Sequence, residues 1–330
     1  RDTSGNFRLS IDRAFSIKGA GLVITGTAVS GQVKIGDQLL VSPSGKPVRG
    51  RGLHVQDQQS EVGQAGQRCA VNIAGDVDKE ALHRGDWLLA PAAHAPVKRL
   101  DARLQVAASE AKALKHWSPV HLHLGAGDFT ARVAVLEGGT IAPGDAALVQ
   151  LVTDAPIAAL KGDRFVLRDQ SAKRTIAGGV IIDPFSPTRG RARPSRIAAV
   201  TAMENADPAT ALAALLKVQP GGTDLGAFAI AHNLSALAGE NLFAQSGLIQ
   251  VQDGKRLWGL STDRWNTVCV DALAAMATWH NTHPHVLGAS ARELISTIPD
   301  HPAEALIKAA LHHHRQPDAL VCRGPLFPLP

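Results

Sequence analysis

An acid and an arginine stand side by side in a segment of this chain that otherwise has the pattern of a β-strand. From Phe7 to Ile17 the apolar residues fall on odd positions, as on a strand with one buried face. Arg13 interrupts this buried phase, and Asp12 belongs to the polar phase. A buried arginine requires a carboxylate or an anionic ligand, because an unpaired buried charge is costly. The alternative is a bulge after Asp12 that turns Arg13 to solvent, and the spacing leaves both interpretations open.

The sequence carries none of the common catalytic or phosphate-binding motifs. It has no G-x-x-x-x-G-K-[ST] phosphate loop, no G-x-G-x-x-G fingerprint, no G-x-S-x-G elbow and no H-E-x-x-H helix. The adjacent residues His312, His313 and His314 do not converge on one ion, because neighbouring helical side chains point about 100° apart. His121 and His123 alternate as on one strand face, without an apparent third ligand. We therefore predict no catalytic site, no metal site and no cofactor in this chain.

Composition and length set broader limits. The 330 residues are 45% hydrophobic and 19% charged, which predicts a folded, soluble protein of two or three domains. Three widely separated cysteines exclude a disulfide framework and fit a reducing cytoplasm. The net charge of +5 permits an anionic partner such as RNA or DNA. Because the chain begins at Arg1 without an initiator methionine, we expect it to be a piece of a longer protein.

Turn signals organise the first 183 residues as β structure. A Gly-Asp pair followed at once by an apolar run occurs four times, at Gly36-Asp37, Gly85-Asp86, Gly144-Asp145 and Gly162-Asp163. Glycine tolerates a positive φ and aspartate bonds nearby backbone, so each pair is expected to close a turn that starts a strand. Two pairs precede Pro91 and two follow Leu100. We predict two β-barrels, at 1–93 and 94–184, joined near Pro91–Pro96.

A basic linker and a first helical module follow the barrels. The linker, at 185–204, contains four arginines: Arg189, Arg191, Arg193 and Arg196. A helix that starts at Asp207-Pro208 follows it. A short helix capped by Thr223 and a third helix at Ser235–Gln245 come next. An Asp-Gly pair between apolar runs, Asp253-Gly254, then predicts a hairpin. Three helices followed by a hairpin are typical of a winged helix, which we place at 205–262.

The last segment, 263–330, has the pattern of a second and weaker winged helix. A long helix is predicted from Arg264 to His280, and Ser290 to Glu293 form a capping box that opens a short helix. A third helix is expected at Ala303–His314. Leu320–Leu329 would form a poor wing. The predicted fold class is therefore multidomain, with two all-β barrels followed by two α+β winged-helix domains.

The residues around Asp12 carry a family resemblance. Asp12-Arg13-Ala14-Phe15 and the run Lys18–Thr27 resemble the second domain of translational GTPases of the elongation factor Tu superfamily, as does Gly66–Gly75. Leu167–Ser171 and Thr175–Gly179 are similar to the closing strands of the third domain. Barrels followed by winged helices narrow the resemblance to bacterial selenocysteine-specific elongation factors, the SelB family.

The resemblance implies carriage of selenocysteyl-tRNA to the ribosome at recoded UGA codons, in the cytoplasm. The family's chain begins with a GTPase domain and ends with four winged helices. This chain would lack the GTPase domain, with its GTP and Mg²⁺, and the last two winged helices. We therefore expect no enzymatic activity here, contact with the messenger hairpin only through the missing C-terminal domains, and no membrane partner.

The resemblance also implies a site for the selenocysteyl group at Asp12, Arg13 and Arg68. Selenocysteine is an anion at neutral pH and its serine precursor is neutral, so two guanidinium groups would favour the first. Asp12 would either hold an arginine in place or accept from the aminoacyl ammonium group, and the sequence leaves both open. Taken alone, Arg68 has the pattern of a solvated strand arginine, and only the family correspondence assigns it a role.

RNA backbone contacts are expected from the linker and the wing tip, although a solvated linker is an equal alternative. The candidate residues are Arg189, Arg191, Arg193, Arg196, Lys255 and Arg256. The helix at Ser235–Gln245 contains no lysine or arginine, which argues against nucleic-acid contacts there.

Other interpretations of the whole chain compete with this one. One is a DNA-binding regulator with a β sensor domain and tandem winged helices. Another is a translational GTPase of the initiation-factor gamma type, and a barrel-held flavin enzyme is more distant.

Overall fold

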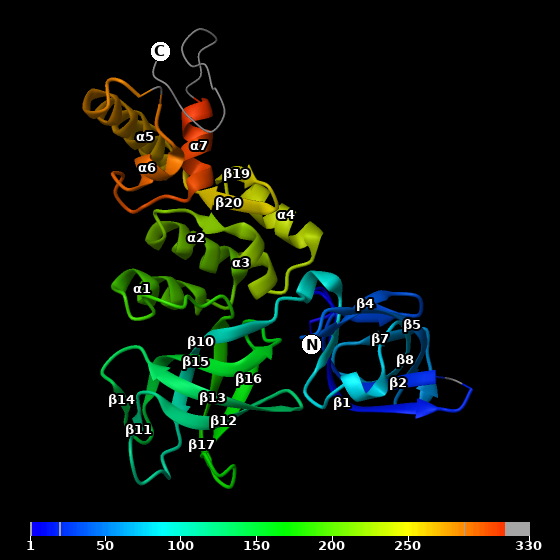
Figure 1. The fold of residues 1–330 in the computed structure, drawn as a ribbon. Helices are drawn as coiled ribbons and strands as arrows, with labels where there is room; N and C mark the ends of the chain where they lie inside the picture. Colours follow the sequence, from blue (N-terminus) through cyan, green and yellow to red (C-terminus); the bar gives the residue numbers. More distant parts are fainter. Residues whose placement is uncertain (1, 20, 287, 314–330) are drawn as a thin grey trace. The chain divides into compact units, whose positions relative to one another are not determined.

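The computed structural model describes residues 2–19, 21–286 and 288–313, and Figure 1 shows their fold. They form two compact units. The first comprises the described residues within 2–200 and 229–239, and the second comprises those within 201–228 and 240–313. The first unit contains both barrels, and the second contains most of the helices.

The first barrel is a closed antiparallel sheet in the order β4-β9-β1-β2-β8-β5, because β5 pairs back to β4. Its strands are β1 (Arg8–Ile17), β2 (Gly21–Ser30), β4 (Gln38–Ser42), β5 (Lys46–Val55), β8 (Arg68–Ala74) and β9 (Trp87–Leu89). Strand β6 (Gln58–Gln59) pairs with the end of β5, and β3 (Gln32–Lys34) pairs with β7 (Val62–Gln64). Fully buried Leu9, Ile11 and Ile24 lie in its core.

The second barrel is also closed, in the order β10-β15-β13-β12-β16-β17. Its strands are β10 (Val97–Val106), β12 (Ser118–Leu124), β13 (Gly127–Val135), β15 (Ala146–Ile157), β16 (Arg164–Arg168) and β17 (Thr175–Asp183). Strands β11 (Leu114–Lys115) and β14 (Thr140–Ile141) form a separate pair. Inward-facing Leu100, Leu122 and Leu151 are fully buried, as the alternation along a barrel strand requires.

The predicted Gly-Asp turns are confirmed as the points where barrel strands begin. All four glycines have a positive φ, between 86° and 99°, and β4, β9, β15 and β16 start directly after their pairs. In three of the turns the aspartate carboxylate accepts the backbone N–H three residues earlier, with Asp37 bonded to Lys34 at 2.7 Å. A side chain thus closes each of these turns, and the following residues are free to pair as a strand.

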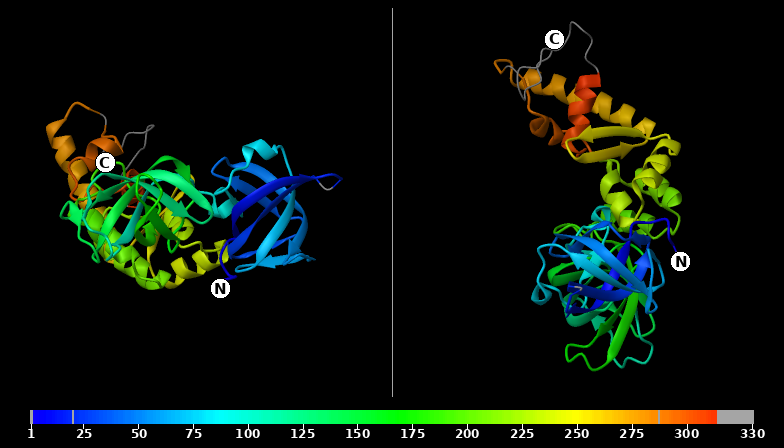
Figure 2. Two further views of the ribbon diagram at one scale, coloured as in Figure 1. Left: turned by 90° about the horizontal axis from the view of Figure 1, so that it is seen from below. Right: turned by 90° about the vertical axis from the view of Figure 1, so that its right-hand side faces the viewer.

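Strand β1 contains the bulge that the sequence left open. Its register with β2 shifts between Ile11, which faces Gly26, and Arg13, which faces Thr25. The extra residue, Asp12, reverses the alternation, and Arg13 is exposed. The assignment of Phe15 and Ile17 to the buried phase was therefore wrong. Their exposed fractions are 37% and 46%, and the β1–β2 hairpin extends beyond the barrel (Figures 1 and 2).

The predicted linker contains a helix, α1 (Pro194–Met203), that the sequence analysis did not foresee. The predicted first winged-helix segment then has the elements α2 (Pro208–Val218), β18 (Thr223–Asp224), α3 (Leu225–Ala231), α4 (Ala236–Gln245), β19 (Ile249–Asp253) and β20 (Arg256–Leu260). Its strands form a sheet in the order β18-β20-β19. Asp207 caps α2 as predicted. The cap assigned to Thr223 was wrong, because Thr223 lies in β18 and the carboxylate of Asp224 accepts the N–H of Ala227.

Three further helices end the described chain: α5 (Thr262–Thr282), α6 (Ala291–Ile295) and α7 (Glu304–His313). The capping box between Ser290 and Glu293 is present. Helix α7 packs beside the β19–β20 hairpin, as Figure 2 shows in red and yellow. His314 and the predicted wing at Leu320–Leu329 lie outside the described residues. Among the helices described, none has the length and apolar character needed to cross a membrane.

Candidate functional site

Asp12 and Arg68 meet on the outside of the first barrel. They lie on β1 and β8, the two neighbours of β2. Both terminal nitrogens of Arg68 donate to the Asp12 carboxylate, Nη1 to Oδ2 and Nη2 to Oδ1, the latter at 3.1 Å. The hydroxyl of Thr25, on β2 between them, donates to Oδ1 at 2.8 Å. Asp12, on β1, is therefore bonded to the central strand β2 and to β8 beyond it.

Arg13 lies alongside this pair. It is exposed and stands opposite Thr25 in the β1–β2 register, and Thr25 stands opposite Ala70 in β8. Directly opposed residues in a sheet project from the same face, so Arg13 and Thr25 share the outer face. Arg68 lies on this outer face too, two residues before Ala70. The structure thus brings the three predicted site residues into one region.

The electrostatics of the site follow from these contacts. Burial raises the pKa of the Asp12 carboxyl, but the hydrogen bonds from Arg68 and Thr25 and the charges of Arg68 and Arg13 lower it more. The resulting pKa lies below 3.8. The hydrogen bond to Asp12 raises the pKa of Arg68. One carboxylate and two guanidinium groups leave one net positive charge. Arg13 is exposed and Arg68 is 52% exposed, so this charge faces solvent and is accessible to an anionic group.

Thr25 is the member of this cluster that sequence reasoning missed. It lay inside the run that carries the family resemblance, but no chemical role was attached to it. The available signal is the spacing of Thr25 and Thr27, which puts two hydroxyl groups on one face of the predicted strand. Only the pairing of β1 with β2 reveals that its hydroxyl reaches Asp12.

The four linker arginines have different environments. Arg189 and Arg193 are exposed, as contacts to an RNA backbone would require. Arg191 is partly buried, and its guanidinium carbon lies 5.4 Å from the ring centroid of Trp117 on the second barrel. This distance is in the range of a cation–π contact, which holds the linker against that barrel.

The assignment of Arg196 to an RNA backbone was wrong. Its side chain is 14% exposed and bonded to two carboxylates of the second barrel, Asp101 and Asp183. The contact from Nη2 to Asp183 is 2.7 Å, and Nε reaches Asp101 at 2.9 Å. Asp101 is fully buried, and burial raises the pKa of its carboxyl despite Arg196. Arg196 therefore fastens the start of α1 to the second barrel.

The wing-tip prediction has a matching local structure. Asp253 and Arg256 are paired across the β19–β20 turn, and Gly254 has a φ of 57°. Lys255 and Arg256 are exposed. Their predicted contact with RNA stays a prediction.

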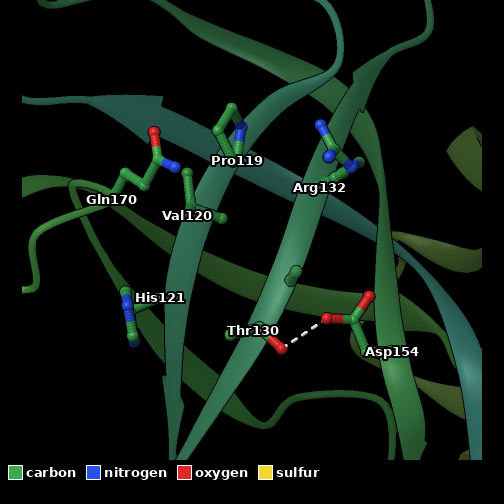
Figure 3. A pocket seen from close by; sticks show the side chains of 8 residues that line it. Pro119, Val120, His121, Thr130, Arg132, Asp154 and Gln170 are labelled. Atoms are coloured by element: carbon green, nitrogen blue, oxygen red, sulfur yellow. Dashed lines mark hydrogen bonds between the residues drawn. The ribbon is translucent and has the colours of Figure 1, made fainter.

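A shallow pocket lies on the second barrel, and none of the predicted site residues lines it (Figure 3). Polar side chains line much of it, including His121, Thr130, Arg132 and Asp154. Thr130 donates to Asp154 at 2.6 Å, and His121 contacts Asp128 at 3.0 Å. Of the lining residues, Thr130 and Asp154 thus pair with each other, whereas the partner of His121 lies outside the lining. Within the part of the chain that the structure describes, no group of three metal-ligating side chains is arranged to hold an ion.

Comparisons with known proteins agree with this architecture. Residues 21–89 match the family described as elongation factor Tu domain 2, and residues 101–188 match the β-barrel domain of the selenocysteine-specific elongation factor. The selenocysteine-specific elongation factor of Escherichia coli is 38% identical over 312 residues, covering 94% of this chain and 48% of that protein. The factor of Desulfomicrobium baculatum is 31% identical over 300 residues, covering 88% of this chain and 46% of that protein.

A solved structure extends the likeness of fold along the chain. The crystal structure of a bacterial selenocysteine-specific elongation factor aligns with a TM-score of 0.71 and 20% identity, covering 99% of this chain and 50% of that one. The two matched barrel domains relate the chain to translation elongation factors of the elongation factor Tu type. Within that class, the chain belongs to the selenocysteine-specific elongation factor family, SelB. It spans about half the length of the curated relatives that it matches.

Proposed function

We propose that this chain is the part of a selenocysteine-specific elongation factor that carries selenocysteyl-tRNA for delivery to the ribosome at recoded UGA codons. The observation that carries the proposal is the cluster of Asp12, Arg13 and Arg68 on the outer face of the first barrel, with its one net positive charge. Cytoplasmic location and a GTPase domain elsewhere in the same protein belong to this proposal.

The cluster is suited to distinguish a selenolate from a hydroxyl. A selenol ionises more readily than a thiol, so the cargo carries a negative charge where serine carries none. Hydrogen bonds to an ionised group contribute about 1.5–3 kcal/mol each. Two such hydrogen bonds therefore provide discrimination on the order of a hundredfold before the cost of desolvation is subtracted.

The contacts of Asp12 favour one of its two predicted roles. Its carboxylate already accepts from Arg68 and Thr25. Holding Arg68 in place therefore fits the geometry better than accepting from the aminoacyl ammonium group. Arg13, exposed and outside this arrangement, is the arginine most open to the cargo.

The accessible basic residues supply a second part of the proposal. Arg189 and Arg193 of the linker, with Lys255 and Arg256 of the wing tip, are exposed. They would track a phosphate backbone without reading sequence, and such binding weakens steeply with salt.

The test is binding of two cargos by alanine variants. Arg13→Ala and Arg68→Ala, placed in a full-length selenocysteine-specific elongation factor that carries this chain, are each expected to weaken selenocysteyl-tRNA binding about tenfold or more. Seryl-tRNA binding should change little. Arg51→Ala serves as the control, because Arg51 is an exposed arginine on β5 of the same barrel. Equal losses for both cargos would contradict the proposal. Tighter binding of duplex DNA than of tRNA would favour the alternative of a DNA-binding regulator.

A further inference from the structure

We propose that Thr25 is a positioning residue of the Asp12 site, whose hydroxyl keeps the Asp12 carboxylate on Arg68 and away from Arg13. The proposal rests on the function proposed above and explains how one acid between two arginines leaves one of them open to the cargo.

The geometry gives Thr25 a fixed place from which to act. Strand β2 is paired on both sides, with β1 and with β8, so its backbone is held by two ladders. Threonine is branched at Cβ, which restricts its χ1 rotation. From this position the Thr25 hydroxyl donates to Oδ1 of Asp12 at 2.8 Å.

The ion pair between Asp12 and Arg68 does not by itself fix the orientation of the Asp12 carboxylate. Arg68 is 52% exposed, and exposed ion pairs are weak because solvent screens them and long side chains lose rotamer entropy in forming them. Asp12 sits at a bulge, where the local ladder is disrupted. A carboxylate there needs a further partner to fix its orientation, and Thr25 is that partner.

The choice matters because Asp12 has two cations within electrostatic reach. Arg13 is its neighbour in sequence, and its charge already favours the ionised form of Asp12. If the carboxylate rotated toward Arg13, it would neutralise the exposed arginine and release Arg68 to solvent. The hydroxyl of Thr25 favours the other arrangement, in which Arg68 is paired and Arg13 faces outward.

The experiment compares three variants of similar shape. Thr25→Val removes the hydroxyl and keeps the branched shape, and Thr25→Ser keeps the hydroxyl. Thr175→Val is the control, because Thr175 is an exposed strand threonine on β17 of the second barrel. Thermal unfolding of each variant checks that the barrel is intact.

The first readout needs no cargo. The pKa of the Asp12 carboxyl, followed in this chain by carbon-13 NMR, is expected to rise in Thr25→Val, because the hydrogen bond that favours the ionised form is lost. It should stay at the wild-type value in Thr25→Ser and Thr175→Val. An unchanged Asp12 pKa in a folded Thr25→Val variant would overturn the proposal.

The second readout is selectivity in the full-length factor. Thr25→Val is expected to reduce the preference for selenocysteyl-tRNA over seryl-tRNA about threefold to tenfold. In a factor that already carries Asp12→Asn, adding Thr25→Val should cause no further loss of this preference, because Thr25 acts through Asp12. If Thr25→Val reduced the preference as much in the Asp12→Asn variant as in the wild-type factor, the proposal would be overturned.

The two readouts separate this proposal from the function on which it rests. If the Asp12 pKa shifts in Thr25→Val while Arg13→Ala weakens both cargos equally, the positioning by Thr25 is supported and the proposed cargo is overturned.

Discussion

Two arginine–carboxylate clusters in the first unit have similar chemistry and opposite surroundings. On the first barrel, Asp12 and Arg68 are 23% and 52% exposed. On the second barrel, Arg196 is 14% exposed and its partners Asp101 and Asp183 are 0% and 11% exposed. The first cluster has two cations for one acid, whereas the second has two acids for one cation. Burial and charge balance therefore give the same residue types different uses.

The comparison shows which arginines are accessible to a ligand. A guanidinium enclosed between two carboxylates fixes a segment of chain, as Arg196 fixes the start of α1. A guanidinium that a single carboxylate holds at the surface keeps donors directed to solvent. The number of arginines in the linker therefore overstates its capacity to bind RNA, because Arg196 and Arg191 are bound to the second barrel.

The largest expected effect is on the buried cluster. Arg196→Ala leaves two buried carboxylates facing each other without their cation, and we expect a loss of about 3–5 kcal/mol in the free energy of unfolding. Urea unfolding of this chain measures it. Arg193→Ala, at an exposed position three residues earlier, is the control and should change stability by less than about 0.5 kcal/mol. Similar stability in the two variants would show that Arg196 does not fasten α1.

The pH dependence of stability should differ in sign between the two acids. The Asp12 pKa is lowered on folding, so its contribution is present above the unfolded value near 3.8 and is lost as pH falls through the folded value. The Asp101 pKa is raised by burial, so its contribution favours the fold at low pH and is lost as pH rises from about 3.8 through the folded value.

Unfolding of Asp12→Asn and Asp101→Asn across pH 2–7 checks these signs. Relative to wild type, Asp12→Asn should lose less stability on acidification. Asp101→Asn should lose less stability than wild type as the pH rises toward neutral. The same slope change in both variants would contradict the contrast.

The sequence predicted the local parts of this architecture and missed those that depend on long-range pairing. Gly-Asp turns were predictable because glycine's positive φ and aspartate's backbone bond act within four residues. The contact of Arg196 with Asp101 joins residues 95 positions apart, and only the closed second barrel and the docked helix α1 reveal it. The bulge at Asp12 was one of two open interpretations, because alternation does not show where a ladder shifts.

Salt dependence sharpens the comparison within the linker. Arg189→Ala and Arg193→Ala, at exposed positions, should each weaken tRNA binding and reduce the slope of log affinity against log salt by about one. Arg191→Ala should reduce the slope less, since its guanidinium packs on Trp117. Titrations of tRNA at several salt concentrations measure the slopes. Slopes equal to that of the wild type in all three variants would exclude the linker from the RNA surface.

The smallest expected effect is the stability of the exposed cluster itself. Arg68→Ala removes a pair in which the arginine is half exposed, so its contribution must be discounted for solvent screening. We expect a loss of at most about 1 kcal/mol in the free energy of unfolding, well below that of Arg196→Ala. Urea unfolding of both variants under one condition provides the measurement. A loss as large as that of Arg196→Ala would mean that Arg68 serves the fold of the barrel, and the case for its role in cargo binding would weaken accordingly.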